Sequence, residues 1–381
     1  MLSLILHLVF WEARKGFIMK YLMLVSLILL CACGMSLRVV CDETDVYLEA
    51  LENSIPGELS LYKSTIFGES VPSFNTFFEY VSSILKASTS YPKRMLFSIL
   101  FIIIISCVYR CLSHSIKNEG VADVFDMICN ASLSLCVFSI TVSAFDVVEK
   151  YLSTVSDFSM ALTPILGGVC ISEGKINEGT VMGVGLSVFV SVCQSFMSGF
   201  LIPLLKVIYS FTIFTSFTGD TFDLSGILSF LKKLFSISLG FVTTLFLSVL
   251  SYQNIIATRS DMLLSKTVRF SLGNIIPVIG GSLAEALKTV SGAFTLIRAS
   301  VGSVGVGVVL FITLSSVVML IVDRLILSFL SGVCSLLGVK KQGRYLSDLS
   351  TFYASLSALV LCSSLMLIIL LSIFSYTSST L

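Results

Sequence analysis

The sequence predicts an all-α polytopic membrane protein of about 8 to 10 spans, with two broken helices in an internal repeat. The chain has 381 residues, of which 55% are hydrophobic and only 12% charged, whereas a soluble domain carries about 25% charged residues. Apolar runs near the ~20 residues that cross a bilayer core recur along it. Within them lie two similar motifs, "LTPILGG" at 162–168 and "IIPVIGG" at 275–281. We call these the two Pro-Gly-Gly motifs.

The N-terminal region has the pattern of a secretory signal. From Met19 the chain reads "MKYLMLVSLILLCACGMS", a lysine, an apolar run and then small residues, which is typical of a signal peptide. We assign 1–40 to this region with Met19 as the natural start. Residues 1–18 are then an upstream extension, or alternatively a long basic lead-in. "LCAC" ending at Cys33 partly matches a lipidation site, and simple cleavage or retention of the signal is the other interpretation.

Residues 41–94 form the only sizeable stretch of soluble composition. We expect this segment to be exported and to form short helices on or near the membrane, because it is short and poor in apolar residues. Eight predicted spans follow it, and the first two make up 95–150. They lie at 95–113, 125–148, 180–201, 203–220, 234–252, 300–320, 321–338 and 351–375.

Two of the boundaries between these spans carry specific expectations. Pro203 interrupts a long apolar run, so it predicts a tight turn. Asp323 and Arg324 follow the boundary at 320/321. If that boundary is a turn, both side chains are interfacial; if it is not, they form a buried pair that needs partners.

The two motifs suggest a duplication, because Pro164 and Pro277 lie 113 positions apart (277 − 164) and similar features follow each in the same order. We assign the first repeat to 151–260 and the second to 261–381. Each contains a predicted basic turn, with Lys232 and Lys233 in the first and Lys340, Lys341 and Arg344 in the second. Since basic loops stay in the cytoplasm, both are expected on that side, which favours a parallel repeat. Coincidence among abundant Leu, Ser and Gly is the alternative.

The motifs also supply the candidate site. A proline followed by Gly-Gly frees backbone groups that hydrocarbon does not tolerate unless protein or a water-filled cavity surrounds them. We therefore expect paired breaks that face one another across the bundle interior. The alternative is that glycines only allow close helix packing, as we expect for Gly302 and Gly305. The pore or broken-helix candidates are Pro164, Gly167, Gly168, Asn274, Pro277, Gly280, Gly281, Glu285 and Lys288. The last two, three positions apart, could instead pair with each other.

Other site chemistries have little support in the sequence. The net charge is +1 without a basic cluster, which argues against nucleic acid as a partner. No catalytic triad pattern, H-E-x-x-H or phosphate-binding loop occurs. His7 and His114 are the only histidines, and most of the eleven cysteines lie in apolar runs, where they act as small hydrophobes. We predict a protein that is not an enzyme, with no catalytic residues, metal site or cofactor.

The block from Ser251 to Gly305 resembles the stage III sporulation protein AE family. The matching positions are Asn274, Pro277, Val278, Gly280, Gly281, Ala284, Gly292 and Gly302. The resemblance implies a subunit of a channel-like complex that a mother cell needs for forespore gene expression. It further implies a location in the mother-cell membrane around the forespore. The implied partners are other proteins of the stage III sporulation A operon, a forespore membrane protein and lipid. Alternatives are a stand-alone secondary transporter of a small solute and a non-transporting scaffold.

Overall fold

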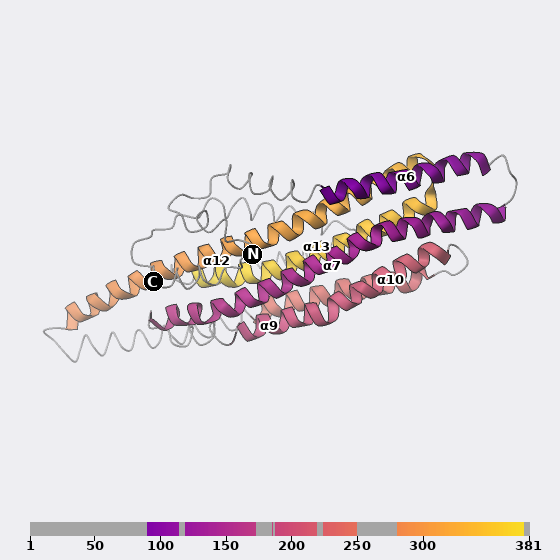
Figure 1. The fold of residues 1–381 in the computed structure, drawn as a ribbon. Coiled ribbons are helices and arrows are strands. Elements are labelled where there is room, and N and C mark those ends of the chain that lie inside the picture. The colour runs from indigo at the N-terminus through magenta and orange to yellow at the C-terminus, as the bar shows by residue number, and fades with distance from the viewer. Residues whose placement is uncertain are drawn as a thin grey trace.

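The computed structural model describes residues 90–113, 119–172, 185, 187–218, 224–249 and 280–376. The elements in these ranges are helices, and no strand occurs among them. They are α6 (Ser90–Ser113), α7 (Glu119–Ser172), α9 (Ser187–Phe196), the π-helical turn η3 (Met197–Leu201), α10 (Ile202–Thr218), a helix at Ser225–Val249, α12 (Gly280–Leu336) and α13 (Lys340–Tyr376). Figure 1 shows them side by side in an elongated bundle. The all-α prediction is confirmed.

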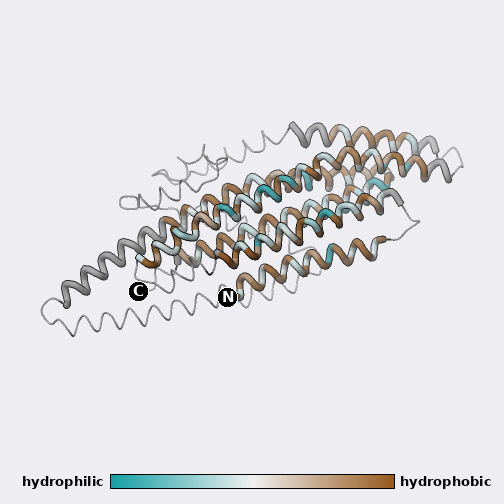
Figure 2. Tube along the Cα trace, turned by 60° about the horizontal axis from the view of Figure 1, so that its bottom comes forward, coloured by the Kyte–Doolittle hydropathy of each residue, from teal (hydrophilic) through white to brown (hydrophobic). Residues whose placement is uncertain are grey.

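Five of the described helices are long and apolar enough to cross a membrane. These stretches are Val124–Ser172, Val188–Ser216, Ser225–Val249, Val304–Leu336 and Lys340–Ser372, and a shorter apolar helix covers Leu96–Tyr109. Apolar residues dominate all of them (Figure 2). Large apolar side chains face outward, for example Phe97 and Leu135, which are 70% and 76% exposed. Lipid would cover such a surface, so the chain is a multi-pass membrane protein.

Three described helices each join stretches that we separated, and two of them, the helix through Pro203 and α12, each unite two of the eight predicted spans. In α7 the predicted break at Pro164 is wrong, since the helix continues through Pro164, Gly167 and Gly168 to Ser172. A proline removes one backbone donor, but α7 keeps the rest of its ladder, and the Pro164 ring is exposed rather than wedged between helices. Neighbouring side chains pack into the core and hold the helix in place: Leu162, Ile165, Leu166 and Val169.

The tight turn predicted at Pro203 is also wrong. α9, η3 and α10 follow one another without a gap, and the Ile202 amide bonds to the Met197 carbonyl, five residues back. Such a π turn widens the helix just before the proline. We attribute the continuity to this wider turn, which moves the preceding carbonyls away from the proline ring.

The third joined helix is α12, which runs without interruption through Asp323 and Arg324. The predicted boundary at 320/321 is therefore wrong. Neither glycine nor proline occurs between Phe311 and Phe329, so no residue there favours a turn. Asp323 consequently lies inside a long helix, well before its end at Leu336, and is only 3% exposed.

A tight turn connects α12 to α13. Gly338 adopts a φ of +75°, a left-handed conformation that favours glycine. The Val339 amide bonds back to the Cys334 carbonyl at 2.9 Å. Lys340 and Lys341 then begin α13, as expected for the second basic turn.

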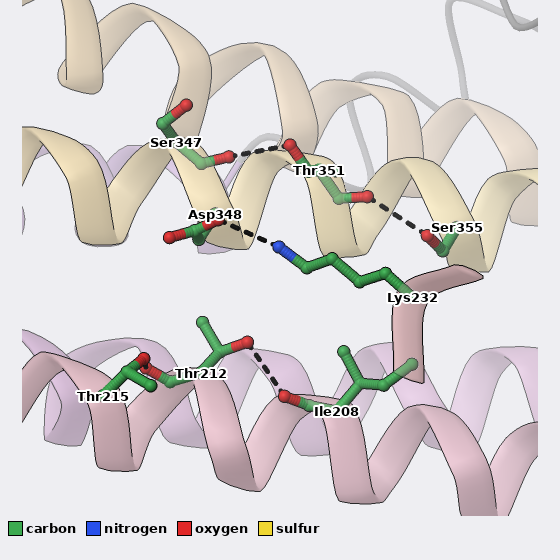
Figure 3. A network of polar contacts seen from close by, with 8 residues as sticks. All are labelled: Ile208, Thr212, Thr215, Lys232, Ser347, Asp348, Thr351 and Ser355. Atoms are coloured by element: carbon green, nitrogen blue, oxygen red, sulfur yellow. Dashed lines mark hydrogen bonds and ion pairs between the residues drawn. The ribbon is translucent and has the colours of Figure 1, made fainter. Parts of the chain in front are cut away.

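The first basic segment is not a turn, because Lys232 and Lys233 lie inside the helix at 225–249. It nevertheless lies at the same end of the bundle as the second. The Lys232 Nζ atom is 2.9 Å from Asp348 Oδ1 on α13 (Figure 3). We call this the basic end. α9, α10 and α12 run toward it, whereas 225–249 and α13 run away from it (Figure 1). α7, which carries the first Pro-Gly-Gly motif, runs away from this end, whereas α12, which begins at Gly280 of the second motif, runs toward it. The parallel repeat and its boundaries stay a prediction.

Close packing between α12 and α13 supports the interpretation of Gly305 as a packing glycine. A Cβ atom placed on Gly305 would lie 3.2 Å from both Leu371 Cδ atoms. That is tighter than ordinary van der Waals contact. Leu371 is fully buried, so α13 occupies the space that a side chain at Gly305 would need.

Candidate functional site

The structure does not bring the predicted site residues together at one level of the bundle. Asn274 and Pro277 lie outside the described residues, as do the side chains of Glu285 and Lys288 in α12. The Tyr151 and Thr313 hydroxyls are 3.3 Å apart, which fixes the register of α7 against α12. At 1.5 Å per residue, Gly168 lies about 26 Å beyond this contact and Gly280 about 50 Å beyond it.

Figure 1 accordingly shows α12 extending past the end of α7. The two motifs therefore occupy different levels along the bundle. In the first motif Gly167 is buried and Gly168 half-buried. In the second, Gly280 and Gly281 begin α12. The proposed role of these motifs as a site stays a prediction.

A different set of residues does come together inside the bundle, which we call the buried polar column. Its members are polar side chains, each less than a tenth exposed, on the inward faces of four helices. They are Asp126, Asn130, Ser134, Thr141 and Tyr151 on α7, Tyr209 on α10, Thr313 and Asp323 on α12, and Gln342, Tyr345, Tyr353, Ser357, Ser363 and Ser364 on α13. From Asp126 to Tyr151 the column rises about 38 Å, a little more than the ~30 Å of a hydrocarbon core.

At the basic end, the column joins three helices through hydrogen bonds. The Gln342 amide donates to Asp126 Oδ1 at 3.2 Å, and the Lys341 ammonium lies 3.6 Å from Asp126 Oδ2. The Asn130 amide donates to the Ser216 carbonyl of α10 at 2.8 Å. The charge of Asp126 is thus balanced by Lys341, and this end of the column is anchored.

The middle of the column is less completely bonded. Thr141 and Tyr353 lie 3.4 Å apart through their hydroxyls. Tyr209 lies near Thr141, and Tyr345 near Ser134, yet neither tyrosine hydroxyl completes a hydrogen bond. Aromatic rings pack at this level: the centre of the Phe352 ring lies 5.4 Å from that of Tyr209, in a tilted arrangement, and 5.5 Å from that of Phe145, in an edge-to-face arrangement.

Several buried oxygens in the column have no hydrogen-bond partner. They are Asn130 Oδ1, Asp323 Oδ2, Gln342 Oε1, the Tyr209 and Tyr345 hydroxyls and Ser363 Oγ. Buried polar atoms normally have a partner, and in membrane proteins an unsatisfied one is costly. Oxygens of this kind can bond to water or coordinate a cation. No group of three His, Cys, Asp or Glu side chains that could hold a metal ion occurs among the described residues.

On its outer side the bundle carries an ion pair of another kind. Lys206 and Glu149 meet at 2.7 Å, and their side chains are 51% and 45% exposed. The Lys206 ammonium also lies 5.5 Å from the centre of the Phe145 ring. Charged groups that keep this much exposure stay hydrated. This pair therefore marks a polar level on the surface rather than part of the column.

Most residues of the column were not predicted as site residues, because each is unremarkable when it is considered singly. A signal for it was present in the spacing of Asp126, Asn130 and Ser134, at four-residue intervals on one helical face. On α13, Gln342, Tyr353 and Ser364 recur on one face in the same way. Asp323 was weighed as interfacial because we placed a turn beside it.

Comparison with known proteins identifies the family. A family model described as "Stage III sporulation protein AE" matches residues 59–378. The chain belongs to the stage III sporulation protein AE family. A curated relative of that name from Bacillus subtilis (strain 168) is 22% identical over 219 residues, which cover 58% of this chain and 55% of the relative. The chain thus spans about half the length of that relative. No solved structure matches the chain.

Membership in this family confirms the resemblance read from the block at 251–305. It gives the chain a role in stage III of sporulation. The apolar helices place that role in a membrane.

Proposed function

We propose that this family member is a membrane subunit of a channel-like complex that connects mother cell and forespore. The family match over 59–378 carries the proposal. The proposed partners are the other proteins of the stage III sporulation A operon and a forespore membrane protein. The proposed location is the mother-cell membrane around the forespore.

The buried polar column supports a transport role over a purely structural one. A scaffold needs only packed apolar helices, and polar atoms buried without partners would destabilise it. A column that is polar over about the thickness of a bilayer suits a path for small hydrophilic species. The proposed subunit would contribute this path, and its partners would supply gating and coupling.

Localisation tests the proposal most directly. In a sporulating host, a fluorescent fusion should collect in the membrane that surrounds the forespore. Deletion of the gene should stop late gene expression in the forespore and leave earlier stages intact. An even distribution over all membranes, together with normal spores after deletion, would refute the proposal.

Reconstitution separates the complex from a stand-alone transporter, which the polar column also permits. The purified chain in liposomes should move no small solute by itself, and flux should need the partner proteins. Flux of a solute or ion by the chain alone, driven by an ion gradient, would favour the transporter.

The predicted role of the second Pro-Gly-Gly motif has its own test. If the motif forms part of the path, changing both Gly280 and Gly281 to Ala should impair sporulation while the protein accumulates normally in membranes. The matched control is Gly305→Ala, which crowds Leu371 and should mainly lower abundance. Full sporulation by the Gly280/Gly281 variant at normal abundance would remove these residues from the site.

A further inference from the structure

One carboxylate in the buried polar column lacks a balancing charge. Asp323 is 3% exposed, and its Oδ2 atom has no hydrogen-bond partner. Three ion pairs elsewhere in the bundle involve other acids: Lys341 pairs with Asp126, Lys232 with Asp348 and Lys206 with Glu149. Among the described residues, no cation lies within ion-pair distance of Asp323.

Hydroxyl groups of α13 lie near the level of Asp323. The Ser350 hydroxyl donates to the Arg324 carbonyl at 3.4 Å, which places the buried Tyr353, about one turn along α13, close to that level. Tyr345 is buried on the same helix. Tyr209 on α10 belongs to the same cluster, and Thr141 on α7 bonds to Tyr353 at 3.4 Å.

Tyr151, also on α7, faces Thr313 at another level. On α12 itself, Arg324 is half-buried and points about 100° around the helix from Asp323.

An isolated carboxylate in the interior of a membrane protein is too costly to remain without a counter-charge. It must bind a proton or a cation. Hydroxyl and carboxylate oxygens suit hard cations. One carboxylate balances one positive charge, and divalent ions such as Ca²⁺ take 6–8 oxygen ligands, usually from several carboxylates. The setting therefore selects a monovalent species.

We propose that Asp323 is a monovalent-cation-binding residue, which holds a proton or an alkali cation at the middle of the buried polar column. The hydroxyls of Tyr353 and Thr141, which lie 3.4 Å apart, are the candidate co-ligands from α13 and α7. The proposal does not depend on the sporulation role and concerns this chain alone. Occupancy of the site would stabilise the packing of α12 against α13 and α7.

Thermal unfolding of the purified full chain in detergent tests the proposal. One arm tests binding of an alkali cation and the other tests binding of a proton. In the first arm, NaCl replaces choline chloride at constant ionic strength and mildly alkaline pH. In the second arm, pH is lowered to mildly acidic values in choline chloride alone. A ligand that binds only the folded state raises the midpoint temperature of unfolding, and the increase grows with the ligand concentration. We expect the wild type to gain several degrees in one arm or the other.

Asp323→Asn is the decisive variant, because it keeps the shape of the side chain and removes its charge. It should be more stable than the wild type in choline chloride at alkaline pH, and it should respond in neither arm. The matched control is Asp348→Asn, whose acid already has Lys232 as a partner. That variant should lose some stability but keep the response of the wild type.

Three outcomes would overturn the proposal: a wild type that responds in neither arm, an Asp323→Asn protein that responds like the wild type, or an Asp348→Asn protein that loses the response. If Asp323→Asn does not fold, Tyr353→Phe decides. It keeps Asp323 and the aromatic ring and should shift the half-saturating Na⁺ concentration or the midpoint pH of the response. An unchanged half-saturation point with this variant would then count against the site.

Discussion

Two apolar helices that start at the basic end of the bundle have opposite surroundings. Of an 18-residue apolar stretch in α13, 78% is buried inside the bundle. Of the corresponding stretch in the helix at 225–249, only 22% is buried. Both carry a basic segment near the start and both are long enough to cross a membrane. One is the centre of the bundle, and the other is open to lipid or to partner proteins along most of its surface.

The difference shows that apolar character does not separate a central helix from a peripheral one in a membrane, since lipid and protein interiors are similarly apolar. Polar residues separate them better. α13 carries Gln342, Tyr353 and Ser364 on its inner face, all buried. Beyond Lys233, the polar residues of the helix at 225–249 are all serines and threonines. Among them, Thr243 and Ser248 donate hydrogen bonds to carbonyls of their own helix.

Removal of a large side chain should reveal the contrast most strongly. Phe352 on α13 is 1% exposed, and Phe241 on the peripheral helix is 63% exposed. Phe352→Ala leaves a cavity between the rings of Phe145 and Tyr209 and should cost about 3 to 5 kcal/mol. Phe241→Ala should change stability by no more than about 0.5 kcal/mol. Denaturant unfolding in detergent measures both, and equal losses would mean that the two helices are not differently packed.

Glycine substitutions should show the same contrast between the central and the peripheral helices, with a smaller loss of stability. Gly305→Val on α12 forces new atoms against Leu371 and should cost about 1 to 3 kcal/mol. At Gly240 on the peripheral helix, no atom lies within 4 Å of the position that a Cβ would occupy. Gly240→Val should therefore be neutral or slightly stabilising, because glycine is a poor helix former. Thermal midpoints check the pair. A stabilised Gly305→Val protein would show that α13 is free to move away from α12.

The ion pair that links the two helices should give the smallest effect. Lys232 and Asp348 are 27% and 35% exposed, so solvent screens much of their attraction. A double-mutant cycle with Lys232→Met and Asp348→Asn should yield a coupling of about 0.5 to 1 kcal/mol, reduced by salt. Lys233→Met, one residue along, should show no coupling to Asp348. Coupling at Lys233 as large as that at Lys232 would contradict the observed contact.

Local sequence signals explain the predictions that held. An excess of apolar residues over charged ones determined a helical membrane protein, because backbone groups in lipid must bond within their own helix. The block around Pro277 identified the family, and a true helix boundary lies between the predicted span ending at 338 and Lys340–Arg344. Gly305 was correctly expected to allow close packing. Each of these depends on residues that are near one another in the chain.

Only the tertiary structure decided where helices continue and which polar residues meet. Pro164 and Pro203 were expected to interrupt the chain, but packing around Leu166 and the π turn at Met197–Leu201 keep both helices continuous. The spacing of polar residues could indicate a polar face on one helix, but not which faces meet in the column, because residues such as Thr141 and Tyr353 lie more than 200 positions apart. Whether Asp323 faces lipid, water or the bundle interior depends on the helices packed around α12, and the sequence of one helix does not specify its neighbours.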